Sequence, residues 1–209
     1  MLIPWSLKNT DLNLPRPLNY HDRTELYLPE SESVIQQQVD KLNLFVHENE
    51  MKVNQEKSKI ILFNTSRKYD FMPRITIDGT NFLEVVEEMK LLGIIIQSNL
   101  KWHSNTLNLC QKGYSRLWML RNLKKHGASR ADLLDVFIKQ CRCMLELAVP
   151  VWSPGITVAE SRQIERVQKA AFAIILGKQY QSYEQALSVL NMESLEDRRL
   201  SICSSFAIK

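Results

Sequence analysis

The chain has 209 residues, enough for one large or two small domains, and its hydrophobic and charged fractions are 44% and 24%. These fractions are typical of a globular protein, so they exclude a fibre or a disordered chain. The formal net charge of +4 is modest, and no apolar run approaches the roughly 20 residues that cross a bilayer. We therefore expect a soluble intracellular protein with no membrane partner, and the composition does not decide between nucleus and cytoplasm.

Residues 1–31 hold four of the seven prolines and show no sustained periodicity, so we expect an extended lead-in there. A helix capped by Ser31 or Ser33 is predicted to follow and to reach His47, with one buried face. The apolar residues of this face recur at helical spacing: Val34 or Ile35, Val39, Leu42, and Phe45 or Val46.

Short strand-forming segments come next. Residues 59–63 are apolar and too few for a helix, and residues 75–86 predict two strands joined at Asp78-Gly79. The apolar run 91–96 predicts a further strand. Residues 32–102 are therefore expected to form a small α/β layer.

From Leu107 onward the apolar pattern becomes helical. The predicted core stripe of the first helix comprises Leu107, Cys110, Tyr114, Leu117 and Trp118. We therefore expect Tyr114 and Trp118 to lie in the core and not to act as platforms for stacked bases. A second helix is predicted over 131–148, because its apolar stripe stops before Pro150.

Three later helices are indicated by their first residues. Thr157 and Glu160 have the spacing of a capping box, and Gly177 suits the end of that helix. Ser182 and Ser194 are predicted to cap two more helices. The predicted fold class is α+β, a small α/β layer followed by an all-helical half.

The four cysteines show no Cys-x-x-Cys pair, and Cys141 and Cys143 would point to different faces of a helix. We expect reduced, buried thiols and no metal site. No Gly-rich phosphate loop or nucleophile–histidine set is present. The adjacent acids Glu87-Glu88 and Glu196-Asp197 are expected in a connection and in a first helical turn, so neither predicts a metal pair.

One segment has a distinctive charge pattern. Between His103 and Arg130 there is no Asp or Glu, while six cations occur: Lys112, Arg116, Arg121, Lys124, Lys125 and Arg130. Lys112 and Arg116 would lie opposite the predicted core stripe. This pattern suits a polyanion such as nucleic acid, and the alternative is an ordinary solvated helix face.

The stretch NEMKVNQEKSKIILF places Asn54, Lys57 and Ser58 directly before an apolar strand. Taken alone, it is more typical of a solvated loop entering a strand than of a functional motif. Together with the preceding helix, the Asp78-Gly79 turn and MKLLGIIIQSNLKW, it resembles the C-terminal palm of reverse transcriptases from non-LTR retrotransposons. In that family an Asn-x-x-Lys-Ser/Thr motif closes the palm, and a Leu-Leu-Gly-hydrophobic motif, here residues 91–94, forms the primer-grip hairpin.

The resemblance covers about residues 11–209, because LELAVPVWSPGITVAESRQIERVQKAAFAIILG and SYEQALSVLNMESLEDRRLSICSSFA resemble the region after the polymerase thumb. It implies four parts. These are a Pro-rich lead-in (1–31), a palm remnant with a primer-grip-like hairpin (32–102), thumb-like helices (103–148) and a helical C-terminal extension (149–209).

By resemblance, Lys57 matches the palm lysine that acts as general acid, and Leu92-Gly93 would position the primer end. The thumb would follow an RNA template and DNA primer through its cations, Lys112, Arg116, Arg121, Lys124 and Lys125. The family's Phe/Tyr-x-Asp-Asp hairpin, which binds Mg²⁺, has no counterpart here, and Asp11 is a single carboxylate. We expect a truncated fragment without a cofactor of its own and inactive alone.

Two other interpretations stay open. The chain could be a nucleic-acid-binding module that keeps the basic thumb face, or a retroelement remnant without a function. A separate upstream fragment of the reverse transcriptase is a possible partner in a split enzyme.

Overall fold

The computed structural model describes residues 27–63, 73–77 and 79–208. They fall into two compact units, which are described separately. Unit 1 comprises the described residues of Met1–Ser58 and Asp70–Glu84, and unit 2 those of Lys59–Tyr69 and Val85–Lys209. Most of the predicted lead-in lies outside the described residues. Its last part, 27–31, is helical, which contradicts the extended prediction there; Pro29 is tolerated because it stands in the first helical turn.

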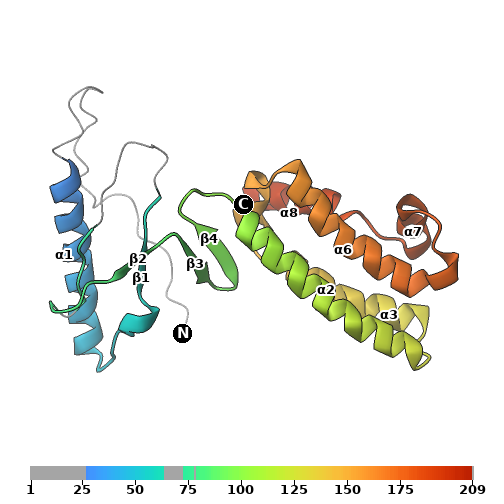
Figure 1. Ribbon diagram of the computed structural model, residues 1–209, viewed down its shortest axis with the longest axis horizontal. Coiled ribbons are helices and arrows are strands. Elements are labelled where there is room, and N and C mark those ends of the chain that lie inside the picture. The colour runs from blue at the N-terminus through green and yellow to red at the C-terminus, as the bar shows by residue number, and fades with distance from the viewer. Residues whose placement is uncertain (1–26, 64–72, 78, 209) are drawn as a thin grey trace, which may run out of the picture. The chain divides into compact units, whose positions relative to one another are not determined.

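Helix α1 (Tyr27–Glu48) dominates unit 1 (Figure 1). The predicted helix is confirmed, but its predicted buried face is wrong, because Val34, Leu42 and Phe45 are each about half exposed. The apolar spacing specified a helix, whereas burial also requires a partner surface on that side of it.

Polar side chains of α1 make its contacts with the extended segment 73–77. The Gln36 amide pairs with both backbone groups of Thr76, accepting from its N–H and donating to its carbonyl at 2.9 Å each. One turn before Gln36, a Glu32 oxygen accepts from the Arg74 N–H at 2.9 Å, and Asn43 donates to the Ile77 carbonyl. These side chains supply partners to an extended backbone as a neighbouring strand would.

The strands are short and pair two by two. The 3-10 turn η1 (Gln55–Lys57) leads into β1 (Lys59–Ile61), which pairs with β2 (Glu84–Val86). The two strands predicted over 75–86 are reduced to a single antiparallel bridge between Thr76 and Phe82, followed by β2. Asp78, in the predicted turn, lies outside the described residues.

Strands β3 (Glu88–Leu91) and β4 (Ile94–Gln97) form an antiparallel hairpin in which Leu91 pairs with Ile94. The turn residues Leu92 and Gly93 both have positive φ, +48° and +93°, as a two-residue type I′ turn requires. The single strand predicted over 91–96 is therefore wrong. A hairpin at this place is what the resemblance implied.

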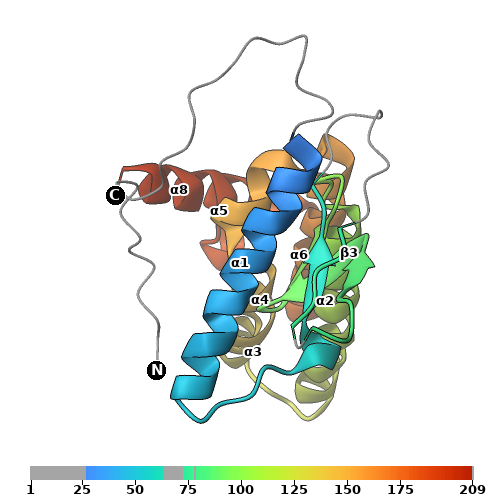
Figure 2. The same ribbon diagram turned by 90° about the vertical axis from the view of Figure 1, so that its left-hand side faces the viewer.

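The rest of unit 2 is helical, which confirms the α+β class. Its elements are α2 (His103–Lys125), α3 (Arg130–Val136), η2 (Phe137–Arg142, a π-helical segment), α4 (Cys143–Leu145), α5 (Val149–Trp152), η3 (Ser153–Gly155), α6 (Val158–Leu176), η4 (Gly177–Gln179), α7 (Tyr183–Leu190) and α8 (Leu195–Ala207). Helices α2 and α6 lie side by side (Figure 1), and α8 runs across their direction (Figure 2). The core between these helices includes Leu117, Phe137, Trp152 and Phe172.

Most predicted helix ends are confirmed. Thr157 and Glu160 form a reciprocal capping box, and Ser194 caps α8 by accepting from the Asp197 N–H at 3.0 Å. Ser182 accepts from the Gln185 N–H, although the Gln185 side chain accepts from the Gln181 N–H instead of closing the box. The helix predicted over 131–148 is built from α3, η2 and α4 and ends at Leu145, before a turn in which Ala148 has a φ of +49°.

Candidate nucleic-acid interface on helix α2

Helix α2 buries one side against α6. Leu109, Gly113, Leu117 and Leu120 lie on this side, and both Leu117 and Leu120 are fully buried. A Cβ added at Gly113 would stand 2.7 Å from Val167 Cγ1, so the glycine lets the two helices approach closely. The packing against α6 decides which side of α2 faces the core.

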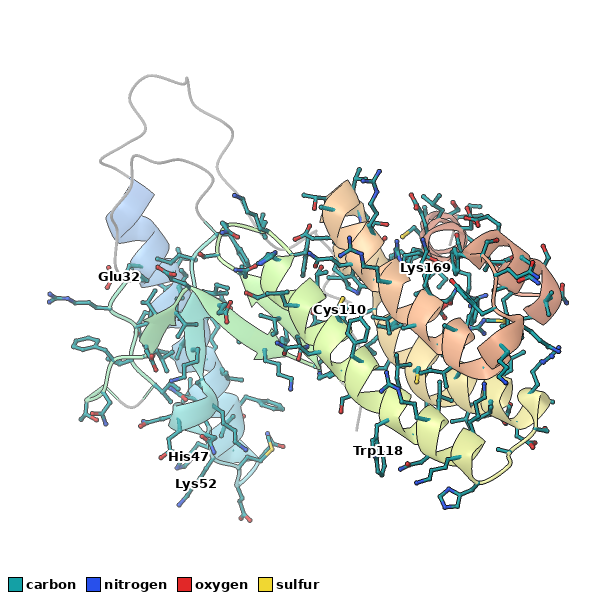
Figure 3. The ribbon with its side chains drawn as sticks, turned by 45° about the vertical axis from the view of Figure 1, so that its right-hand side comes forward. Glu32, His47, Lys52, Cys110, Trp118 and Lys169 are labelled. Atoms are coloured by element: carbon teal, nitrogen blue, oxygen red, sulfur yellow. The ribbon has the colours of Figure 1, made fainter. Side chains whose placement is uncertain are left out.

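The opposite side of α2 carries two aromatic rings, and this corrects the sequence prediction. Tyr114 is 43% and Trp118 66% exposed, so neither is a core residue. Leu107, also assigned to the predicted core stripe, is 41% exposed. The exposed residues recur every three or four positions and form what we name the α2 stripe: Leu107, Gln111, Tyr114, Trp118, Arg121 and Lys125. Figure 3 shows Trp118 extending away from the helices.

The five predicted nucleic-acid-binding cations divide into two groups. Arg121 and Lys125 are exposed on the α2 stripe, and Lys112 is half-buried on another side of the helix. Among the described residues, none of these three side chains makes a hydrogen bond or ion pair. Their charges are therefore available to a phosphate backbone.

Arg116 and Lys124, in contrast, hold the fold together. The Arg116 guanidinium donates to the Gln140 carbonyl in the π-helical segment. The Lys124 ammonium donates to the Ile174 carbonyl and, at 3.3 Å, to that of Ile175, close to the end of α6. A cation suits this place because carbonyls at a helix C-terminus lack intrahelical partners and carry partial negative charge.

Helix α6 adds three exposed cations that the sequence interpretation missed. Arg162, Arg166 and Lys169 recur at helical spacing and line a cavity of about 400 Å³. Its other lining residues are Tyr183, Ser194 and two acids, Glu165 and Glu196. The Lys169 ammonium lies 4.7 Å from the centre of the Tyr183 ring. The spacing of these cations was the signal that could have found them.

Arg166 also lies near the α2 stripe. Burial, with the Cys110 thiol, raises the pKa of Tyr114, and the Arg166 charge opposes that rise. Arg166 is therefore close enough to Tyr114 to act on its pKa.

The motif residues before β1 have a local structural explanation. The Asn54 side chain accepts from the Lys57 N–H at 3.0 Å, and the Ser58 hydroxyl donates to the Asn54 carbonyl at 2.8 Å. Lys57 itself is exposed. It belongs to unit 1, whereas Leu92, 90% exposed, and Gly93 belong to the hairpin of unit 2.

The Mg²⁺ that the sequence resemblance implies does not fit the two adjacent acid pairs, Glu87-Glu88 and Glu196-Asp197. Glu88 accepts from the Ser104 hydroxyl at 2.8 Å, and Asp197 accepts from the Ser194 hydroxyl at 2.6 Å, so each adjacent acid pair includes a carboxylate with a structural role. No group of three or more potential ligands gathers among the described residues. Holding two ions requires clustered carboxylates, and neither adjacent acid pair provides such a cluster.

The cysteines are all helical, and Cys110 and Cys141 are buried as predicted. Burial raises the pKa of the Cys141 thiol to about 11. Cys143 is exposed, so the prediction of buried thiols is wrong for that residue. Its sulfur donates to the Lys139 carbonyl on the outer side of the helix.

In the part of the chain that the structure covers, no helix is both long and apolar enough to cross a membrane. Neither a protein-family model, nor a curated protein, nor a solved structure matches the chain. The resemblance to reverse transcriptases is therefore an interpretation of the sequence alone.

Proposed function

We propose that this chain is the C-terminal palm and thumb portion of a reverse transcriptase of the non-LTR retrotransposon type, and that it binds nucleic acid through α2. One observation carries the binding proposal. The segment from His103 to Arg130 contains no acid, and Arg121 and Lys125 stand exposed on one side of its helix. When such cations bind the phosphates of a nucleic acid, they release its condensed counterions. This release gives affinity without sequence specificity.

Polymerization would require carboxylates that this chain does not supply. The 209 residues contain no adjacent pair of aspartates, and the adjacent acids do not fit a two-metal site. In this proposal Lys57 has no leaving group to protonate, and catalysis needs a separate fragment that contains the Asp-Asp hairpin. A primer-extension assay of the purified chain with Mg²⁺ or Mn²⁺ should show no incorporation; incorporation would overturn this part.

The binding experiment uses a fluorescently labelled RNA–DNA hybrid and fluorescence anisotropy over a range of salt concentrations. Lys125→Met should weaken binding and lower the salt slope by about 1, because one phosphate contact is lost. The matched variant Lys124→Met should leave affinity unchanged. It should instead lower the free energy of unfolding by about 0.5–1 kcal/mol, since carbonyls near the end of α6 lose their cation.

Two results would contradict the proposed interface. One is binding that does not depend on salt. The other is unchanged binding in a variant that combines Arg121→Gln with Lys125→Met. Circular dichroism of each variant confirms that the helices remain folded.

A specific observation also favours a split enzyme. The apolar side of α1 is half exposed at Val34, Leu42 and Phe45, although its spacing is that of a core-facing helix. An upstream reverse transcriptase fragment that covers this side would bury it. Co-expression should then yield a complex that Leu42→Asp weakens; the absence of any complex would leave the nucleic-acid-binding module as the function.

A further inference from the structure

We propose that Tyr114 and Trp118 are stacking platforms for unpaired bases, so that the α2 stripe binds single-stranded nucleic acid in preference to blunt duplex. This inference rests on the proposed nucleic-acid binding and specifies its ligand. The observation that carries it is the position of two exposed aromatic rings, one helical turn apart, on the same side of α2 as Arg121 and Lys125.

The fold itself gives no reason for an exposed indole at residue 118. Leu117 and Leu120 pack into the core beneath α2, and both are fully buried. Two other tryptophans show how the chain uses this residue for packing. Trp102 is 9% exposed, and Trp152 is fully buried, with its indole N–H donating to the Leu147 carbonyl at 2.8 Å. Trp118, at 66% exposed, contributes little to such packing.

The spacing of the α2 stripe suits a strand with its bases turned toward the helix. Tyr114 and Trp118 are four residues apart, a rise of about 6 Å along the axis. Arg121 and Lys125 follow Trp118 by about 4.5 Å and about 10.5 Å. Phosphates next to the stacked bases would therefore meet cations on the same side of the helix.

Charge favours nucleic acid over a protein as the occupant. No acidic residue lies between His103 and Arg130, and Arg166 of α6 stands near Tyr114. A surface that combines cations with exposed rings matches the two features of single-stranded nucleic acid, a charged backbone and apolar base faces. In a blunt duplex the base faces are stacked on one another, so only the phosphates would be accessible to this surface.

The test measures fluorescence anisotropy of the full chain with two labelled probes, an oligo(dT) strand and a blunt duplex of equal length. Trp118→Ala should weaken binding to the single strand by about tenfold, the loss expected for one stacked base, and change duplex binding little. Trp118→Phe keeps a ring and should stay within about threefold of the original chain. Val189→Ala, an exposed apolar residue of α7 outside the α2 stripe, is the control and should not change binding.

The outcomes separate this inference from the proposed function. If Trp118→Ala binds oligo(dT) as the original chain does, while Arg121→Gln with Lys125→Met weakens it, the rings have no role and the inference fails, although the proposed function stands. If neither probe binds at low salt, both fail. Self-association without nucleic-acid binding, lost in Trp118→Ala, would assign the stripe to a second copy of the chain and overturn the inference.

Discussion

Helices α1 and α2 have 22 and 23 residues, and both carry apolar side chains at helical spacing, yet only α2 buries a full side of them. The contacts of α1 with its own unit include hydrogen bonds that join the side chains of Glu32, Gln36 and Asn43 to an extended backbone. Those of α2 are a closely packed apolar surface around Gly113 and Leu117. Two helices with similar patterns are therefore stabilised by different kinds of interaction.

The difference teaches that apolar periodicity predicts a helix without predicting what covers it. In α2 the rings that strengthen the apolar pattern are exposed, while a glycine occupies the tightest contact. A small residue contributes little to an apolar pattern, although it permits the closest approach of two helices. Mutations in the two helices should consequently have effects on stability that differ in magnitude and in the unit where they occur.

The largest effect is expected for Leu117→Ala in α2. Its side chain is fully buried, so the variant loses the transfer free energy of the removed atoms and leaves a cavity. We expect the free energy of unfolding to fall by about 2–5 kcal/mol, measured by urea denaturation followed by circular dichroism. A loss below about 1 kcal/mol would mean that the packing described for α2 is wrong.

In α1 the corresponding test is Gln36→Leu, which keeps the size of the side chain and removes its two hydrogen bonds to Thr76. The two backbone groups of Thr76 lose their partners at a cost of about 1–2 kcal/mol. The effect should be local, with faster amide hydrogen exchange near Thr76 and unchanged exchange in α2 and α6. Uniform acceleration in both units would contradict the comparison.

A smaller loss is expected for Gly113→Ala. Contact of the new methyl group with Val167 costs about 1–3 kcal/mol, and the better helix propensity of alanine offsets about 1 kcal/mol. The expected net loss is about 1 kcal/mol, measured as a lower Tm. Ser115→Ala, on the exposed side of the same helix, is the control and should not lower the Tm.

The smallest effect is expected for Leu42→Ser in α1. The side chain is 50% exposed, so the free energy of unfolding should change by less than about 0.5 kcal/mol. Urea denaturation is again the measurement. A loss comparable with that of Leu117→Ala would show that the apolar side of α1 is buried in solution.

The features that were predictable from sequence are those decided within a few residues. Thr157, Ser182 and Ser194 accept from backbone groups three residues later, so their positions along the chain determine the caps. The α+β class could also be predicted, because the spacing of apolar residues changes along the chain from short strand-like runs to helical repeats.

The features that could not be predicted depend on what packs against a residue. Lys124 and Lys125 are neighbours of the same type, yet only Lys124 meets the last turn of α6, some 50 residues later. The side of α2 that faces the core could not be predicted either, because the contact of Gly113 with Val167 arises only when two helices meet. The sequence therefore predicted Tyr114 and Trp118 in the core, although both are exposed.

The turn of the β3–β4 hairpin has a consequence for protein engineering. Leu92 occupies a left-handed backbone position, which costs a leucine about 1–2 kcal/mol, while its side chain is 90% exposed and recovers little of that cost by packing. Asparagine followed by glycine is the favoured pair for such a turn. Replacing Leu92 with asparagine would therefore raise the free energy of unfolding and give a more stable protein for biochemical work. Helix α2 and its exposed rings would be unchanged.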